Sequence, residues 1–247
     1  DLNLTPRLYF PKLSNETIIL DYKQTHYVKT VLRIKVGQKI ILFNGNGLEA
    51  EAKIASFGDK NTTLHPHDFK NISRDPPTEI TVAQCLCLSN KMDYVVQKST
   101  ELGAANILPI NSQRNQLNLS INLQKKKIQR WQLIADASSQ QCGRTNRTIV
   151  QAPMDIESFF SEEKKKNKKT LRWVLDPDAT LSVSNVGLKN ANKLLILIGP
   201  EAGFSDEEDL LANESCFTAI KFGKRILRTE TVAPAILAVV NYKLGEF

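Results

Sequence analysis

The sequence predicts an α/β protein in which a parallel sheet with helices on both faces follows a smaller β-rich module. Strand and helix patterns alternate from residue 78 onward, and this alternation is typical of a parallel sheet. Several strand patterns there are apolar on both faces, as expected where helices cover both sides of a sheet. The residues before 74 are instead dominated by short strand patterns.

The β-rich module is expected to contain one short helix between Asp21 and Ile34. Asp21 is a residue type that caps helices, because its carboxylate accepts hydrogen bonds from the first free backbone N–H groups. Val28, Val31 and Leu32 follow at helical spacing, so we expect them to share the buried face of this helix.

A β-hairpin is expected next. Lys39–Phe43 is an apolar strand pattern, and Leu48–Ile54 alternates between apolar and polar residues. The residues between them read Asn-Gly-Asn-Gly, and such residues adopt the left-handed conformations that a tight turn needs. The two segments should therefore pair antiparallel.

A domain boundary is predicted at 74–77, which reads Arg-Asp-Pro-Pro. Two prolines end any regular element and stiffen a linker. The sequence therefore divides into a first domain, 1–73, and a second domain, 78–247.

In the second domain, helices are predicted where apolar residues recur every three or four positions, and strands where short apolar runs occur. Gly103 is expected to end one helix, and the Ser-Asp-Glu-Glu sequence at 205–208 is a capping box that opens another. The predicted elements are strand 78–88, helix 91–102, strand 105–110, helix 123–141, strands 171–175 and 194–198, a helix after 205, and strand 218–222.

The last helix is predicted to run from Thr231 to about Leu244. Pro234 sets this start, because proline lacks an N–H group and is best tolerated in the first four positions of a helix. The prediction leaves 228–230, which reads Arg-Thr-Glu, as a shaped loop after the last strand.

The composition is that of a basic globular protein. Its 33 Lys and Arg against 26 Asp and Glu give a formal net charge of +7, which favours a polyanionic partner such as nucleic acid. No apolar run reaches the roughly 18 residues of a membrane span. The first residues also lack the basic-then-apolar pattern of a signal peptide. We therefore expect a cytoplasmic protein that does not engage a membrane.

The cysteines do not predict a metal site. Cys85 and Cys87 would share one face of a strand, but no second pair or histidine follows at zinc-like spacing. Cys142 and Cys216 lie far from them in the sequence. Reduced, buried thiols are the expected state.

Two loops follow the carboxyl ends of predicted strands, where open α/β sheets bind their ligands. In the first, Ile198–Phe204, Gly199 and Gly203 allow a ligand to approach the backbone closely. The second, 223–231, leads into the last helix. By spacing alone these loops are equally compatible with ordinary strand-to-helix turns, since the sequence has no phosphate-binding or nucleophile-elbow motif.

The identities of the residues in these loops indicate a function more specifically than their spacing does. Residues 196–205 read ILIGPEAGFS and residues 226–231 read ILRTET. They resemble the LIGPEGGFS and ILRTET signatures of the ribosomal small-subunit RNA methyltransferase E family, and the resemblance extends over essentially the whole chain. Further matching stretches follow the same order: Arg7–Tyr9, His26 with Val31–Arg33, Lys91–Met92, Gln97–Gly103 and Gln140–Arg144.

The resemblance implies a fold and an activity. Such enzymes methylate N3 of a uridine in 16S ribosomal RNA (rRNA), with S-adenosylmethionine (SAM) as methyl donor and without a metal. They belong to the SPOUT class, whose C-terminal chain threads a trefoil knot, and their N-terminal domain resembles the PUA-type β-barrel of RNA-modifying proteins. The resemblance therefore also implies a homodimer that acts on 16S rRNA within the small ribosomal subunit.

The resemblance further assigns residues to a cofactor site and an RNA surface. The RNA-binding residues could equally be surface cations that serve solubility. The cofactor-binding residues it implies are Leu197, Ile198, Gly199, Pro200, Glu201, Gly203, Ile226, Leu227, Thr229 and Thr231, and the RNA-binding residues are Arg7, His26, Arg33, Lys91 and Arg144.

Arg228 and Glu230 are the catalytic residues that we expect. A guanidinium at Arg228 can face a uracil oxygen and stabilise negative charge on the deprotonated base. Glu230 is expected to orient other groups, because an ordinary carboxylate pKa near about 4.3 suits a base for so weak an acid poorly. An ion pair of Arg228 with Glu230 or Glu201 is the alternative.

Two residues depart from the family pattern. Ala202 stands where a second glycine is usual, and alanine would cost about 1 kcal/mol if this position needs a positive φ. Pro234 replaces a small or apolar residue. Neither change removes a polar residue of the two signatures.

Three alternatives stay open. The first is a SPOUT methyltransferase that acts on tRNA or on another rRNA position. The second is a catalytically silent RNA-binding assembly factor that keeps the fold. The third, a nucleotide-binding α/β enzyme without RNA, is disfavoured by the missing phosphate loop and by the basic charge.

Overall fold

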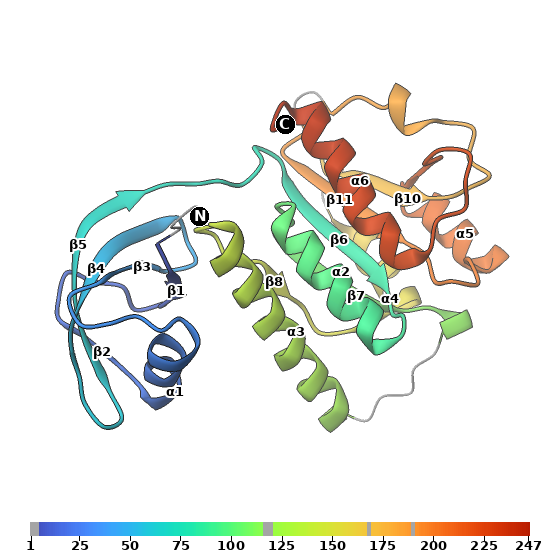
Figure 1. The fold of residues 1–247 in the computed structure, drawn as a ribbon. Helices are drawn as coiled ribbons and strands as arrows, with labels where there is room; N and C mark the ends of the chain where they lie inside the picture. The colour runs from blue at the N-terminus through green and yellow to red at the C-terminus, as the bar shows by residue number, and fades with distance from the viewer. Residues whose placement is uncertain (1–4, 116–120, 167–168, 189–190) are drawn as a thin grey trace. The chain divides into compact units, whose positions relative to one another are not determined.

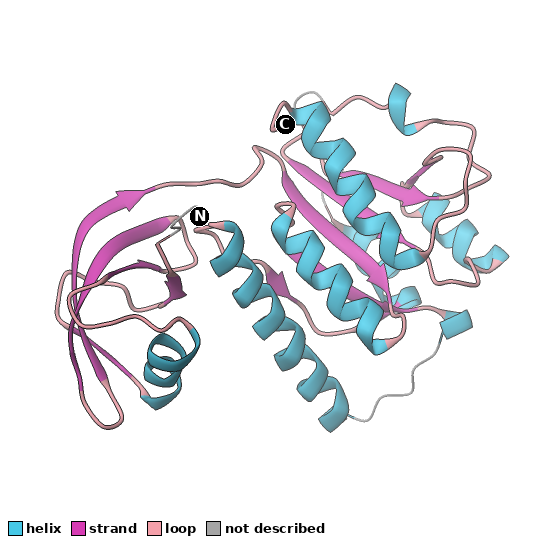
Figure 2. Cartoon of the chain, in the orientation of Figure 1, coloured by secondary structure: helices cyan, strands magenta, loops and turns pink. Residues whose placement is uncertain are grey.

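The computed structural model describes residues 5–115, 121–166, 169–188 and 191–247 (Figures 1 and 2). The chain forms two compact units. Unit 1 comprises Asp1–Arg74 together with Ser139–Arg147, and unit 2 comprises Asp75–Ser138 and Thr148–Phe247. Unit 1 is thus discontinuous in sequence, which the sequence patterns did not predict.

Unit 1 is built on a curled sheet of five strands, in the order β1-β3-β4-β5-β2. β1 and β3 pair parallel, and the other neighbours pair antiparallel. The predicted hairpin is confirmed as β3 and β4, and β4 continues beyond Ile54 to Phe57. The strands are β1 (Arg7–Tyr9), β2 (Ile18–Leu20), β3 (Lys39–Phe43), β4 (Leu48–Phe57) and β5 (Thr62–Asn71).

The short helix of unit 1 begins where the sequence predicted. Asp21 caps α1 (Tyr22–His26) in a capping box, in which Gln24 N donates to Asp21 Oδ1 at 2.8 Å and Asp21 N donates to Gln24 Oε1 at 3.2 Å. The chain then widens into a π-helix, Tyr27–Val31. This change of period buries Val28 but leaves Val31 59% exposed, so the prediction that both share the buried face was wrong.

The segment 139–147 belongs to unit 1 through backbone contacts. Arg147 N donates to the carbonyl oxygen of Gly45 at 2.9 Å, within the turn of the hairpin. The hydroxyl of Thr145 hydrogen-bonds to the carbonyl oxygen of Ile72, which lies just beyond β5. These bonds join residues that are far apart in the sequence, so no local sequence pattern could have predicted them.

Unit 2 contains a sheet in the order β12-β10-β11-β6-β7-β8, with β9 paired to β7, and every pair is parallel. The predicted parallel sheet is therefore confirmed, although the first and last predicted strands are shorter than expected. The strands are β6 (Glu79–Cys85), β7 (Asn106–Asn111), β8 (Ile149–Val150), β9 (Met154–Asp155), β10 (Leu171–Leu175), β11 (Lys193–Ile198) and β12 (Thr218–Ile220).

Helices cover both faces of this sheet. Side chains of β11 alternate between the faces, so Ile196 and Ile198 join a core cluster with α6, while Leu195 and Leu197 join one with α4 and α5. α2 and α6 lie side by side on one face (Figure 1). The helices are α2 (Ser89–Glu101), α3 (Ile121–Cys142), α4 (Ile156–Lys165), α5 (Asp206–Glu214) and α6 (Thr229–Leu244).

The last helix starts earlier than predicted. α6 begins at Thr229 with Arg228 as its N-cap, and Pro234 lies inside it. The predicted start at Thr231, and the loop predicted at 228–230, were therefore wrong. A proline inside a helix costs about 3 kcal/mol. Burial of Ile236, Leu237 and other apolar residues of α6, roughly 1.5–3 kcal/mol for each large side chain, outweighs that cost.

The C-terminal part of unit 2 is hydrogen-bonded to the segment that connects β10 and β11. Lys221 N donates to Leu181 O at 2.8 Å, and Val183 N donates to Lys221 O at 3.0 Å. Near the chain end, Lys243 Nζ donates to Ser184 O at 3.0 Å. These hydrogen bonds join the connection between β10 and β11 to the C-terminal part of the chain. Among the described residues, no helix is long and apolar enough to cross a bilayer.

Candidate active site

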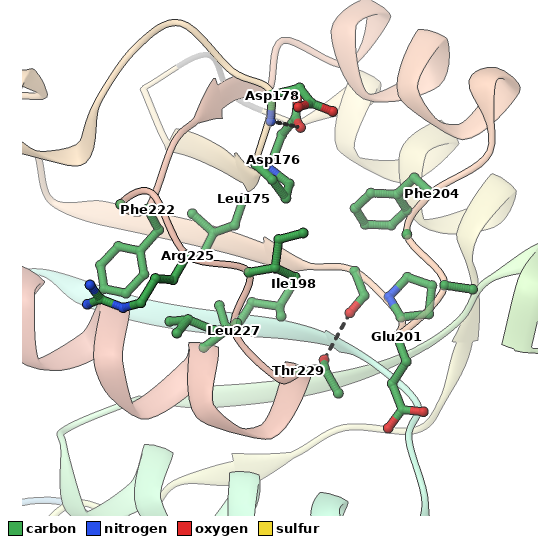
Figure 3. Close-up of a pocket in the computed structure, with 18 of the residues that line it drawn as sticks. Leu175, Asp176, Asp178, Ile198, Glu201, Phe204, Phe222, Arg225, Leu227 and Thr229 are labelled. Carbon is green, nitrogen blue, oxygen red and sulfur yellow. Dashed lines mark hydrogen bonds between the residues drawn. The ribbon is translucent and has the colours of Figure 1, made fainter.

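A pocket of about 400 Å³ lies at the carboxyl ends of three neighbouring strands of unit 2 (Figure 3). Leu175 ends β10, Ile198 ends β11, and Phe222 follows β12. The volume falls in the range of roughly 300–1,000 Å³ that is usual for small-molecule sites. The position is the one at which parallel α/β sheets bind ligands, because several loops meet there.

The walls of the pocket combine apolar and acidic side chains. Ile198, Leu227 and Phe222 offer apolar surface, while Asp176 and Asp209 offer carboxylates. Burial raises the pKa of Asp209, and the neighbouring carboxylate of Asp176 raises it further. Such a site suits a ligand that has an apolar ring system and a positively charged group.

The backbone of the first loop has one position that favours glycine. Gly203 has a φ of +71°, in the left-handed region. Ala202 is not among the described residues with positive φ, so the strain considered for this departure from the family pattern is absent. At Gly199, an added Cβ would lie 3.0 Å from the Phe204 ring, which explains the need for a small residue there.

The loop after β11 is fixed to its surroundings by a buried carboxylate. Glu208 accepts hydrogen bonds from Ser205 N and from Gln113 N, both at 2.8 Å, and Glu208 N donates to Ser205 Oγ at 3.2 Å. These bonds confirm the predicted capping box of α5. In addition, Arg114 Nη1 donates to Ala202 O at 2.9 Å. The neighbouring residues Gln113 and Arg114 therefore anchor the first loop and the start of α5.

The two signature loops are also bonded to each other. Thr229 Oγ1 donates to Gly199 O at 2.9 Å (Figure 3). Behind them, Gln84 Nε2 donates to Thr229 Oγ1 at 2.9 Å. We did not predict a role for Gln84. The sequence did offer an indication, because a polar residue on the same strand face as the apolar Ile80 and Val82 is unusual.

A charged cluster lies beside the pocket. The Lys91 ammonium forms a close ion pair with Glu201, and its Nζ lies 3.5 Å from Glu230 Oε2. The hydrogen bond with Glu201 raises the pKa of Lys91. Cys87 is buried nearby, and burial together with Glu230 raises the pKa of this thiol to about 12. Lys91, expected on an RNA surface, thus joins two residues expected in the active site.

Arg228 is exposed and makes no hydrogen bond or ion pair with Glu201 or Glu230 in the described structure. The alternative role considered for it, pairing with one of these carboxylates, is therefore not observed. Arg228 and Glu230 lie next to Thr229, which lines the pocket, but they are not lining residues themselves.

Most residues of the expected cofactor set line the pocket. Leu197 does not, because its side chain faces α4 and α5 in the core, and the exposed Thr231, in the first turn of α6, does not either. Of the lining residues that we did not predict, Leu175, Asp176 and Asp178 could have been found, because they lie at or just after the carboxyl end of the predicted strand 171–175. The expected residues in the lining are Ile198, Gly199, Pro200, Glu201, Gly203, Ile226, Leu227 and Thr229, and the unexpected ones include Leu175, Asp176, Asp178, Phe204, Asp209, Phe222 and Arg225.

Two residues expected to bind RNA make contacts within unit 1 instead. Arg7 Nη2 donates to Glu49 Oε2 at 2.9 Å and to Arg144 O at 3.4 Å, and Arg144 is only 3% exposed. The buried Arg144 side chain is not available to a phosphate in this structure, which corrects the expectation for that residue, whereas Arg7 is partly buried and forms an ion pair with Glu49. His26 and Arg33 are exposed, and Arg33 has a positive φ of 53°.

The described residues contain no group of three or more His, Cys, Asp and Glu side chains that could hold a metal ion. Cys85 and Cys87 are buried free thiols, as expected. Cys216, in contrast, is exposed, so burial does not extend to all four cysteines.

The fold and the pocket define a class of protein. The family model described as an RNA methyltransferase domain matches residues 74–241, and the RNA methyltransferase PUA domain matches residues 20–64. These two matches cover the parallel sheet with its pocket and the main part of the curled sheet. The chain is therefore an RNA methyltransferase with a PUA-type module.

Comparison with named relatives identifies the family within the RNA methyltransferases to which the chain belongs. The chain is 32% identical over 246 residues to ribosomal RNA small subunit methyltransferase E of Buchnera aphidicola from Schizaphis graminum, covering 98% of this chain and 97% of that protein. It is 27% identical over 256 residues to the protein of the same name from Bacillus subtilis, covering 95% and 96%. The chain belongs to the ribosomal RNA small subunit methyltransferase E family.

Two solved structures share the whole fold. A methyltransferase from Legionella pneumophila, in complex with SAM, has a TM-score of 0.89 and 30% identity, covering 97% of this chain and 98% of that one. Ribosomal RNA small subunit methyltransferase E from Neisseria gonorrhoeae, bound to SAM, has a TM-score of 0.88 and 26% identity, with the same coverage.

Proposed function

We propose that this chain transfers a methyl group from SAM to N3 of a uridine in 16S rRNA of the small ribosomal subunit. The observation that carries the proposal is the pocket between the two signature loops, at the carboxyl ends of β10, β11 and β12. Relatives that share this fold were solved with SAM, and the curated relatives are named for small-subunit rRNA.

The residues of the pocket fit SAM. Ile198, Phe222 and Leu227 would pack against the adenine ring, and Asp176 and Asp209 would neutralise the positive charges of the cofactor. SAM supplies a methyl group on a positively charged sulfur, which is already a good leaving group. The protein's own contribution is therefore positioning and charge stabilisation.

The RNA base must reach this pocket unpaired. N3 of uracil lies on the Watson–Crick edge, so the nucleotide has to be single-stranded or flipped before reaction. Loss of the N3 proton leaves negative charge on the uracil oxygens. Exposed Arg228, at the start of α6, is our candidate for stabilising this charge, and Glu230 is our candidate for an orienting group because it pairs with Lys91.

RNA contacts are proposed for both predicted domains, 1–73 and 78–247, and in the second the candidate is Arg228, as described above. In the first, His26 and Arg33 are exposed and remain candidates for contact with phosphates. Arg144 is no longer a candidate, because it is buried, and the partly buried Arg7 is paired with Glu49. The PUA-type match over residues 20–64 includes both retained positions.

A homodimer and a cytoplasmic location complete the proposal. α2 and α6 pack together and leave Tyr94 and Tyr242 exposed, with Leu88 at the start of α2. A second copy of the chain would cover these apolar side chains. The cytoplasm is where the proposed ribosomal substrate is assembled. Light scattering at several concentrations measures the mass, and a monomer throughout would contradict the dimer.

One experiment separates the proposed reaction from its alternatives. The protein is incubated with radiolabelled SAM and small subunits from a strain that lacks the enzyme, and the labelled nucleotide is then mapped. Label on N3 of one 16S uridine supports the proposal. Label elsewhere in rRNA, or only in tRNA, indicates another SPOUT specificity. RNA binding without label and without SAM binding by calorimetry indicates a silent assembly factor.

A further inference from the structure

Gln84 is a buried polar residue in an apolar row. Side chains of β6 alternate between the two faces of the sheet, so Gln84 continues the row of Ile80 and Val82, which pack in the core cluster that includes α6. Gln84 is 0% exposed. Its Oε1 has no hydrogen-bond partner among the described residues, and an unsatisfied buried polar atom destabilises the folded state. Stability alone would favour an aliphatic residue here.

The amide of Gln84 organises a chain of hydrogen bonds. Its Nε2 donates to Cys85 O at 3.0 Å and to Thr229 Oγ1 at 2.9 Å. The Thr229 hydroxyl in turn donates to Gly199 O at 2.9 Å. Because a hydroxyl has one proton, the bond received from Gln84 leaves that proton free for Gly199. The direction of both bonds is therefore fixed.

This chain of bonds connects the two halves of the pocket. Gly199 is the first residue after β11, and Thr229 is the first residue of α6. Both residues line the pocket, whereas Gln84 lies behind them and does not. A change at Gln84 can therefore alter the spacing of the two loops without removing a contact with the ligand.

We infer that Gln84 is a positioning residue, which sets the spacing of the two signature loops for the cofactor through Thr229 and Gly199. The inference rests on the proposed function in one respect, namely that SAM is the ligand of the pocket. It adds a residue that neither signature contains.

The test measures SAM affinity by calorimetry for Gln84→Met and for Thr229→Val. Methionine keeps the volume and loses both polar atoms, so we expect the Kd for SAM to rise about tenfold, the equivalent of one hydrogen bond of roughly 1–1.5 kcal/mol. The double variant should bind no more weakly than the weaker single variant, because both changes break the same chain of bonds.

Asn241→Leu is the matched control for Gln84→Met. Asn241 is also a buried amide, with Nδ2 donating to Leu102 O at 2.8 Å and with an unpartnered Oδ1, but it lies near the far end of α6. Thr148→Val is the control for Thr229→Val, since Thr148 Oγ1 donates to Ala104 O at 2.7 Å outside the pocket. Both controls should change the midpoint of thermal unfolding but leave the Kd for SAM within twofold of the wild type.

The outcomes are distinct. A wild type that does not bind SAM overturns the proposed function, and the positioning role with it. A wild type that binds SAM, together with Gln84→Met at unchanged Kd or at the same Kd as Asn241→Leu, overturns the positioning role alone. Additive losses in the double variant also overturn it. If Gln84→Met does not fold, Thr229→Val against Thr148→Val decides.

Discussion

Lys91 Nζ lies 3.5 Å from Glu230 Oε2 while it forms a closer ion pair with Glu201. Three segments contribute these groups: the first turn of α2, the loop after β11 and the first turn of α6. A single ammonium therefore neutralises two carboxylates that border the pocket. Glu230 Oε2 accepts no hydrogen bond in the described structure, so its ion pair with Lys91 is the contact that can orient it, and the exposed Arg228 guanidinium pairs with neither carboxylate.

Lys91→Met is expected to impair turnover more than cofactor binding. The change leaves Glu201 and Glu230 facing each other without a counter-charge, so both side chains are expected to move apart. We expect kcat to fall by roughly tenfold or more, where each factor of ten corresponds to about 1.4 kcal/mol of lost positioning. Methyl transfer to small subunits measures this.

Lys98→Met provides the control, because Lys98 forms an ion pair with Glu101 on the same helix at a distance of 2.8 Å and does not line the pocket. Equal losses of kcat in the two variants would show that Lys91 has no specific role.

Arg228→Ala tests the proposed charge stabilisation. The side chain is exposed and caps nothing, so its removal should leave folding unchanged. We expect kcat to fall by about 10²-fold, as is usual when a group that stabilises developing negative charge is lost, and the Kd for SAM to change little. Turnover close to that of the wild type would exclude a catalytic role for Arg228.

Glu49→Gln is expected to destabilise unit 1. Glu49 accepts from Arg7 Nη2 at 2.9 Å and from Arg74 Nη1 at 3.1 Å, and the exchange leaves the partly buried Arg7 without its carboxylate. The expected loss in free energy of unfolding is about 1–3 kcal/mol. Denaturant unfolding measures it, with Glu51→Gln as the control on the same strand, since Glu51 pairs with the exposed Lys39. Similar losses for the two variants would argue against a buried network.

The contribution of Glu49 should also depend on pH. Burial alone would raise the pKa of Glu49, but the hydrogen bonds from Arg74 and Arg7 outweigh it and hold the pKa below the usual value. The stabilisation is therefore fully present above the ordinary glutamate pKa of about 4.3, and it is lost as the pH falls through the lower value of the folded state. The difference between wild type and Glu49→Gln should shrink in that acid range and stay constant at neutral pH.

Gly103→Ala should destabilise unit 2. Gly103 has a φ of +88°, and an added Cβ would lie 2.7 Å from Pro76 Cδ. Strain and steric overlap act together, so we expect a loss of more than about 1 kcal/mol. At Gly187 an added Cβ meets nothing within 4 Å, so Gly187→Ala should be nearly neutral. Thermal unfolding distinguishes the two, and a neutral Gly103→Ala would contradict the packing at Pro76.

Arg33→Gln should weaken RNA binding through the loss of one phosphate contact. Arg33 is exposed and keeps a left-handed backbone, a conformation that non-glycine residues adopt rarely. We expect the slope of log K against log salt to decrease by about one. Lys53→Gln, which removes an exposed cation on β4, is the control. An unchanged slope for Arg33→Gln would remove this residue from the RNA surface.

Short-range patterns in the sequence determined much of this protein. The capping boxes at Asp21 and Ser205, the hairpin with its Asn-Gly turn and the parallel α/β sheet all follow from residues close to one another in the chain. The two signature loops also identified where the pocket lies, because strand ends in a parallel sheet meet at one edge.

Tertiary structure decided the rest. It set the start of α6, because burial of the apolar face of that helix outweighs the cost of Pro234. It also placed Lys91 between two carboxylates, paired Arg7 with Glu49 and buried Arg144. It joined 139–147 to unit 1 and brought Gln84 behind Thr229. Each of these features depends on hydrogen bonds or packing between segments that are far apart in the chain. Interactions of this kind leave no pattern in the local sequence from which they could be predicted.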